Sequence, residues 1–138
     1  MTTVNPLLGK HLLIVEDDWL LQNLLSIKLT PLKEQGATID AAFDGTKAVE
    51  LVKIKRPDVI LLDLLLPGMT GFEFLESAQK TDTTFREVPV IVFSNLNSQE
   101  DRDRARTLGV KEFMHKSDST IEEISEMLLK VLAETPKQ

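Results

Sequence analysis

Apolar and polar positions follow two patterns along this chain: short continuous apolar runs and longer stretches with helical periodicity. The apolar runs predict five strands, over residues 11–15, 38–43, 59–62, 88–93 and 110–114. Apolar residues that recur every three or four positions predict five helices, which begin near Trp19, Thr46, Phe72, Asn97 and Ile121. Helical spacing marks an amphipathic helix, whereas a continuous run marks a strand buried on both faces. The chain is therefore predicted to contain five successive strand–helix units.

Proline and capping residues set the predicted boundaries. Thr30-Pro31 should end or kink the first helix, and the polar stretch 81–87 is typical of a loop. Asn97-Ser98 should cap the fourth helix, with Glu100 three residues after Asn97, and Thr120 with Glu123 has the spacing of a helix capping box. The periodic pattern occupies residues 10–133, so we interpret these as one domain with tails at 1–9 and 134–138.

Strict alternation of strands and helices predicts an α/β fold, a three-layer sandwich with a parallel five-stranded sheet and helices on both faces. Right-handed crossovers place all strand-to-helix turns at one edge of the sheet, where such folds bind ligands. Five polar side chains follow the carboxyl ends of predicted strands: Glu16, Asp17, Asp63, Ser94 and Lys116. We expect them to converge on one small surface.

These residue types suit phosphoryl transfer. Neighbouring carboxylates stay ionised only around a cation, and oxygen ligands without His or Cys favour Mg²⁺. Lys116 and Ser94 can hold phosphoryl oxygens while Asp63 attacks to form an aspartyl phosphate. Taken singly, Asp63 and Ser94 could be turn residues, Asp17 a helix cap and Lys116 a solvated charge. Their shared edge of the sheet is what favours a site over these ordinary uses.

Composition narrows the classes of protein further. The 138 residues are 42% hydrophobic and 28% charged, which is typical of a globular domain. A net charge of −6 argues against a nucleic-acid surface, and the lack of cysteine excludes disulfides and thiol chemistry. No apolar run has the length of a membrane helix, and the first residues lack a signal-peptide pattern. We therefore expect a cytoplasmic protein without a membrane partner.

Four segments, residues 13–18, 59–71, 90–94 and 113–116, together resemble the motifs of response-regulator receiver domains of two-component signalling. The resemblance covers nearly the whole chain in the right order. It implies the CheY-like, flavodoxin-like fold with strand order 2-1-3-4-5. It also implies that Asp63 accepts a phosphoryl group from the phosphohistidine of a histidine kinase or phosphotransfer protein.

The resemblance assigns the remaining site roles residue by residue. It implies that Glu16 and Asp17 hold Mg²⁺ together with Asp63 and the backbone carbonyl of Leu65. Ser94 would swing to the phosphate, and Lys116, at the end of residues 113–116, would pair with it.

Two positions depart from the family pattern, and two more stand where the family tunes dephosphorylation. Phe113 replaces a common Tyr at the switch position, so any coupling to the phosphate would act through packing. Ser117 replaces the usual Pro, so a cis bond before it would be a strained non-proline one. Leu65 and Leu96 stand where the family tunes dephosphorylation. Neither side chain can orient an attacking water, which predicts slow loss of phosphate.

The predicted output is a protein–protein contact. The charge of a phosphoryl group would shift the helix over 97–108, the fifth strand and the last helix between two packings. We expect this face to bind an unidentified output protein, and the chain to be a monomer or a weak dimer through the same face. The chain would be a signalling phosphoacceptor that catalyses its own phosphorylation and dephosphorylation, not an enzyme for a separate substrate. Trp19, expected to be packed, should report Mg²⁺ by fluorescence.

Three alternatives remain. A receiver-like interaction module that works without phosphorylation would keep the fold, although it would not need the full set of site residues. A haloacid-dehalogenase-like phosphatase needs a second Asp where Leu65 stands. A flavodoxin-like electron carrier needs a phosphate-binding loop where Glu16-Asp17-Asp18 stand.

Overall fold

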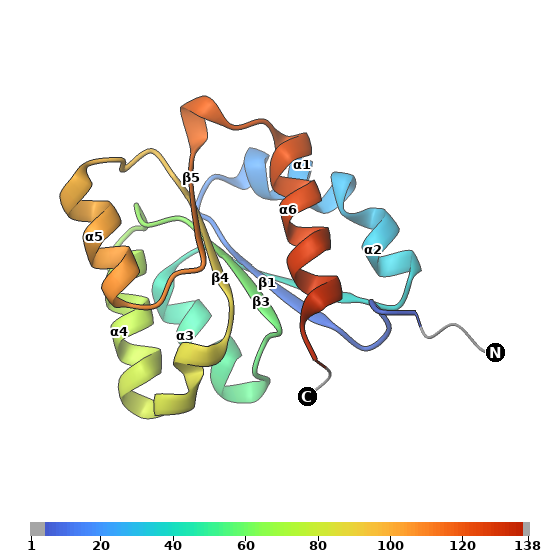
Figure 1. The fold of residues 1–138 in the computed structure, drawn as a ribbon, viewed down its shortest axis with the longest axis horizontal. Helices are drawn as coiled ribbons and strands as arrows, with labels where there is room; N and C mark the ends of the chain where they lie inside the picture. Colours follow the sequence, from blue (N-terminus) through green and yellow to red (C-terminus); the bar gives the residue numbers. More distant parts are fainter. Residues whose placement is uncertain (1–4, 137–138) are drawn as a thin grey trace.

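Five strands form one parallel sheet in the order β2-β1-β3-β4-β5, with helices on both faces (Figure 1). The computed structural model describes residues 5–136. Its strands are β1 (His11–Val15), β2 (Thr38–Ala42), β3 (Val59–Leu62), β4 (Val90–Ser94) and β5 (Glu112–His115). The predicted α/β class, parallel pairing and strand order are confirmed.

The helices divide between the two faces of the sheet as right-handed crossovers require. One face carries α1 (Trp19–Lys28), α2 (Thr30–Glu34) and α6 (Ile121–Glu134). The other carries α3 (Gly45–Ile54), α4 (Gly71–Thr81) and α5 (Gln99–Thr107). Two 3₁₀ turns, η1 (Thr83–Glu87) and η2 (Lys116–Asp118), complete the fold.

Each face of the sheet has its own hydrophobic core. In β3, Val59 and Leu61 pack toward α1 and α6, whereas Ile60 and Leu62 pack toward α3 and α4. All four side chains are buried, because successive residues of a strand point to opposite faces and both faces are covered. The continuous apolar run before Asp63 is thus explained, and it fixes Asp63 at the end of a central strand.

Several predicted boundaries move. The predicted end of the first helix before Pro31 is confirmed, since α1 ends at Lys28. The short helix α2, which was not predicted, then begins with Pro31 in its first turn, where no backbone donor is needed. The stretch predicted as a loop contains η1, which buries Phe85. Of the two predicted capping residues Asn97 and Ser98, Ser98 caps α5 by accepting from the backbone N–H of Asp101, and the pairing of Asn97 with Glu100 is not used. The capping box of Thr120 and Glu123 is confirmed.

Packing extends beyond the predicted domain limits of 10–133. Leu7, in the predicted first tail, is buried in the core beneath α1 and α6. The Asn5 amide donates to the carbonyl of Gln35, and Lys10 Nζ lies 2.9 Å from Thr135 Oγ1. The terminal parts of both predicted tails, residues 1–4 and 137–138, lie outside the described residues.

No helix within residues 5–136 has the length and apolar character needed to cross a membrane. The expectation that Trp19 is packed is wrong, since its side chain is 67% exposed at the start of α1. It still lies directly after the acidic residues that follow β1.

Candidate functional site

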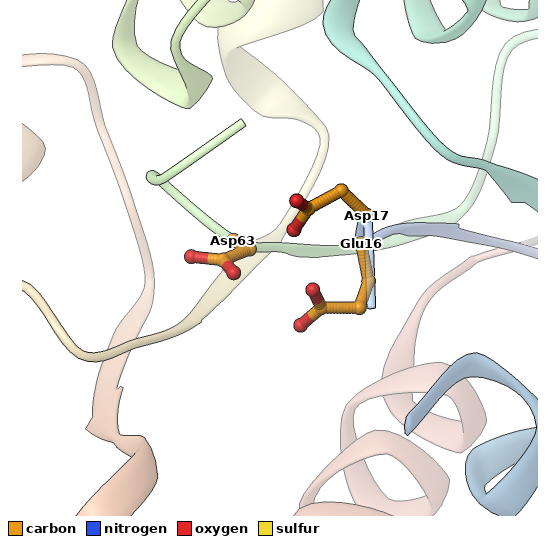
Figure 2. A group of neighbouring side chains, drawn as sticks. All are labelled: Glu16, Asp17 and Asp63. Carbon is orange, nitrogen blue, oxygen red and sulfur yellow. The ribbon is translucent and has the colours of Figure 1, made fainter. Parts of the chain in front are cut away.

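Three carboxyl groups meet at the carboxyl edge of the sheet. Glu16 and Asp17 follow β1, and Asp63 follows β3, its neighbour in the sheet. One oxygen from each group lies within 4.8 Å of the other two, and Figure 2 shows the Glu16 and Asp17 carboxyl groups turned toward Asp63. The expected convergence is therefore present for these three residues.

Three hydrogen-bond donors surround the carboxylate of Asp63. Ser94 Oγ donates to its Oδ1 at 2.7 Å, and Lys116 Nζ donates to its Oδ2 at 2.8 Å. The backbone N–H of Leu65 also donates to Oδ1, at 3.0 Å. With only 4% of Asp63 exposed, these donors take the place of water around its charge. The fold thus brings together all five polar residues that the sequence placed at the sheet edge.

Lys116 links the two buried acids. Its Nζ lies 2.6 Å from Glu16 Oε1 as well as 2.8 Å from Asp63 Oδ2. Burial alone would lower the pKa of Lys116, but its hydrogen bonds to Asp63 and Glu16, with their charges, outweigh burial and raise it. Lys116 is therefore held as a cation between two carboxyl groups.

Glu16 is the carboxyl group of the cluster whose ionised form is disfavoured. Burial raises the pKa of Glu16 from 4.5 to about 7, and the charge of Asp63 adds to this rise. Hydrogen bonds from Lys116 and from the backbone N–H of Asp18 oppose it without cancelling it. A divalent cation among the carboxylates would relieve this cost, because it favours the ionised form.

The donor set fits Mg²⁺. The three acids offer hard oxygen ligands, and Asp17 is exposed, so water can complete an octahedral shell. Within residues 5–136, these are the three acidic or histidine side chains close enough to share an ion. The role of the Leu65 carbonyl as a further ligand stays a prediction.

Gln22 supports the acidic turn, and sequence reasoning missed it. Its amide nitrogen is buried and lies 3.1 to 3.3 Å from the carbonyl oxygens of Ile14, Glu16 and Ala42. It therefore ties α1 to the ends of β1 and β2. The available signal was a polar residue on the inward face of an amphipathic helix.

Gly71 shapes the loop that follows Asp63. A Cβ atom there would lie 2.6 Å from the carbonyl oxygen of Asp63 and 2.8 Å from Cα of Leu64. The backbone N–H of Gly71 donates to the carbonyl of Leu64 at 3.1 Å. The loop after Asp63 can therefore close onto α4 only if this position has no side chain.

The predicted tuning residues Leu65 and Leu96 contact Asp63 and Ser94 through their backbone N–H groups, and the switch residue Phe113 lies on β5. Leu65 is 50% exposed and Leu96 is partly buried. Phe113 is half-buried on β5, with the Arg102 guanidinium 4.7 Å from the centre of its ring. The Lys116–Ser117 peptide bond is trans, as are the other peptide bonds of the described segment. The functional roles of Leu65, Leu96 and Phe113 stay predictions.

The family model for the response regulator receiver domain matches residues 12–129. Among curated proteins, the Regulator of RpoS from Escherichia coli K12 is 33% identical over 127 residues, which are 92% of this chain and 36% of that protein. The chain thus spans about a third of the length of this relative.

Solved receiver domains have the same fold. The non-phosphorylated HemR receiver domain from Leptospira biflexa aligns with a TM-score of 0.79 and 26% identity, over 94% of this chain and 99% of that one. The receiver domain of the sensor histidine kinase PA1611 from Pseudomonas aeruginosa, whose structure has a magnesium ion coordinated in the active site cleft, aligns with a TM-score of 0.74 and 25% identity, over 90% and 98%. The family match, the sheet order and the convergent acidic edge lead to one conclusion: this chain belongs to the response regulator receiver domain family of two-component signalling.

Proposed function

We propose that Asp63 is the phosphoacceptor of an Mg²⁺-dependent response regulator, and that Glu16, Asp17 and Asp63 hold the metal. The observation that carries this proposal is the set of donors around one carboxylate: Ser94 on one oxygen and Lys116 on the other. A structural Asp needs partners for its charge, but not two further acids within 4.8 Å. The magnesium ion in the PA1611 receiver domain supports the choice of metal.

In the transfer step, an Asp63 carboxylate oxygen attacks the phosphorus of a phosphohistidine. The bond between phosphorus and the imidazole nitrogen breaks, and the nitrogen leaves with its electron pair. Lys116 already lies at Asp63 Oδ2 and Ser94 at Oδ1, so small movements bring both donors to the oxygens of the transferred group. Glu16, Asp17 and Asp63 would hold Mg²⁺, which would supply positive charge to offset the negative charge that gathers there.

The donor is proposed to be a histidine kinase or a phosphotransfer protein, and the protein to act in the cytoplasm. The domain supplies the groups for its own phosphorylation and for the later hydrolysis. Leu65 and Leu96 offer no group that positions water, so we infer a long-lived aspartyl phosphate. The surface formed by α5, β5 and α6 is proposed to bind the output protein. The chain is proposed to be a monomer, or a weak dimer through the same surface.

The remaining candidate is a receiver-like module that binds its partner without phosphorylation. Nothing in its task requires Lys116 to sit 2.6 Å from Glu16 and 2.8 Å from Asp63. The intact constellation therefore favours the phosphoacceptor.

The test is incubation of the protein with acetyl phosphate, with and without Mg²⁺, followed by intact mass measurement. Wild type should gain the mass of one phosphoryl group only with Mg²⁺, and Asp63→Asn should gain none. Asp58→Asn serves as a matched control, since Asp58 is also buried but lies at the opposite end of β3. Equal labelling of wild type and Asp63→Asn would contradict the proposal.

A further inference from the structure

A cavity of about 260 Å³ lies between α3, α4 and the turn η1. The apolar part of its wall includes Val49, Val52, Ala78 and Phe85. Both helices begin at the edge of the sheet that carries Asp63, whereas the cavity is lined by their middle and carboxyl-terminal turns. The cavity therefore lies away from the acidic site, and none of its described lining residues belongs to that site.

Arg56 lines this cavity with its guanidinium held in one orientation. Its Nη1 donates to Thr84 Oγ1 and its Nη2 donates to the carbonyl oxygen of Thr84, both at 2.7 Å. Its Nε is buried and has no hydrogen-bond partner among residues 5–136. A buried donor without an acceptor is costly, so this N–H would gain from an oxygen atom that a ligand brings into the cavity.

Among the described residues, two cationic side chains and one acidic side chain line the cavity: Lys53, Arg56 and Asp82. Lys53 is exposed and forms no ion pair in the described part of the chain. Asp82 Oδ2 lies 3.6 Å from Arg56 Nη1, and hydrogen bonds from Thr84 lower the pKa of Asp82, so its carboxylate stays ionised. This carboxylate would repel a dianion more strongly than a single charge, and the two cations still favour an anion over a neutral molecule.

We propose that this cavity binds a small monocarboxylate with an apolar body. One carboxylate oxygen would accept from Arg56 Nε with Lys53 nearby, and the body would pack against Val52 and Phe85. The volume suits a molecule of about ten non-hydrogen atoms, because pockets for drug-sized ligands begin at about 300 Å³. Burial of the body supplies most of the affinity, and the charge-assisted hydrogen bond sets the orientation. The site goes beyond the proposed phosphoacceptor role and does not depend on it.

The experiment titrates the full chain with phenylacetate in about 0.15 M NaCl and follows the backbone amide chemical shifts. The shifts should concentrate over residues 49–56 and 77–85 and should saturate with a Kd of about 1 mM, the affinity expected for a ligand of this size. Phenylacetamide has the same body without the charge, and acetate has the charge without the body. Each should bind at least about tenfold more weakly than phenylacetate.

Four variants test the assigned contacts. Arg56→Lys keeps the charge but removes Nε, and it should weaken phenylacetate binding by about tenfold. Lys53→Gln removes a more exposed charge and should weaken it by about threefold. Val52→Phe keeps every charge and places a ring in the cavity, so it should prevent binding. The matched control is Lys55→Gln, which removes a charge beside the cavity but outside its lining and should change Kd by less than about twofold.

Equal binding of phenylacetamide, or shifts that lie outside the two segments, would overturn the inference. An unchanged Kd in Val52→Phe, or equal weakening by Lys53→Gln and Lys55→Gln, would overturn it as well. The amide spectrum shows whether each variant is folded, and Lys53→Gln, at an exposed position, keeps the test decisive if Arg56→Lys does not fold. Tighter binding of benzylphosphonate than of phenylacetate would assign the cavity to a phosphate-like dianion and reject the monocarboxylate.

Discussion

At the residue scale, Leu65 and Leu96 contact the candidate site through their backbones. Leu65 donates its backbone N–H to Asp63 Oδ1, and the backbone N–H of Leu96 lies 3.4 Å from Ser94 Oγ. Their backbones therefore serve the site whatever the side chain is. Their side chains are free to differ, and here both are apolar, so under the proposed function neither would orient a hydrolytic water.

The lifetime of the phosphorylated form should follow from these two side chains. Leu65→Asn combined with Leu96→Glu should speed loss of phosphate by about tenfold, because polar groups can then orient water. The phosphorylated fraction is followed by mass after removal of the donor. Leu129→Asn, at another exposed leucine, is the control and should leave the rate unchanged. A rate that the double substitution leaves unaltered would reject the assigned role.

At the scale of elements, α1 does more than cover the sheet. Gln22 reaches from its inner face to carbonyl oxygens at the ends of β1 and β2, so the helix fixes the turn that carries Glu16 and Asp17. Asp18 caps the same helix by accepting from the backbone N–H of Leu21 at 3.1 Å. Gln22 and Asp18 therefore both fix the acidic turn against α1.

Gln22→Ala should lower the free energy of unfolding by about 1–3 kcal/mol, since buried carbonyl groups lose their donor. It should also weaken Mg²⁺ binding, as reported by Trp19 fluorescence, because the turn loosens. Urea denaturation measures the first effect and Mg²⁺ titration the second. Asn23→Ala, at the exposed neighbouring position, should stay within about 0.5 kcal/mol of wild type. Equal effects at both positions would show that the Gln22 contacts carry no special energy.

At the scale of the whole molecule, the site should couple stability to pH and to Mg²⁺. The folded-state pKa of Glu16 is raised from 4.5 to about 7, so the folded state binds the proton more tightly than the unfolded chain. The stabilising contribution of this group is therefore complete below about pH 4.5 and is lost as pH rises through about 7. Mg²⁺ should restore stability at the higher pH by replacing that proton.

The melting temperature should accordingly rise more with Mg²⁺ at about pH 8 than at about pH 6, where the metal competes with a proton on Glu16. At a concentration of Mg²⁺ about a hundred times Kd, the gain is about 2.7 kcal/mol. Differential scanning fluorimetry at both pH values measures the shift. Glu16→Gln should reduce the shift and remove its pH dependence. An equal shift at both pH values in wild type would contradict the raised pKa.

Sequence patterns predicted the features that depend on local residue order, such as individual strands. They also predicted which residues meet at the sheet edge, because the alternation of strands and helices fixes where each strand ends. The apolar run before Asp63 predicts a central strand, and alternation of strands and helices then brings Glu16, Asp63 and Lys116 to one edge. Sequence patterns failed where a boundary depends on competition between neighbours. The sequence offered Asn97 and Ser98 as neighbouring caps of α5 without deciding between them, and it did not predict the short helix α2 after Leu29, because tertiary packing chooses among similar local options.

The sequence by itself determined the fold class and the members of the site, because side-chain periodicity and strand ends are encoded residue by residue. Only the tertiary structure decided which contacts those members make. Lys116 bridging Glu16 and Asp63, Gln22 beneath the acidic turn and Arg102 over Phe113 join residues that lie far apart in the chain or on different elements. Such contacts depend on the distance between packed elements, which no local pattern specifies.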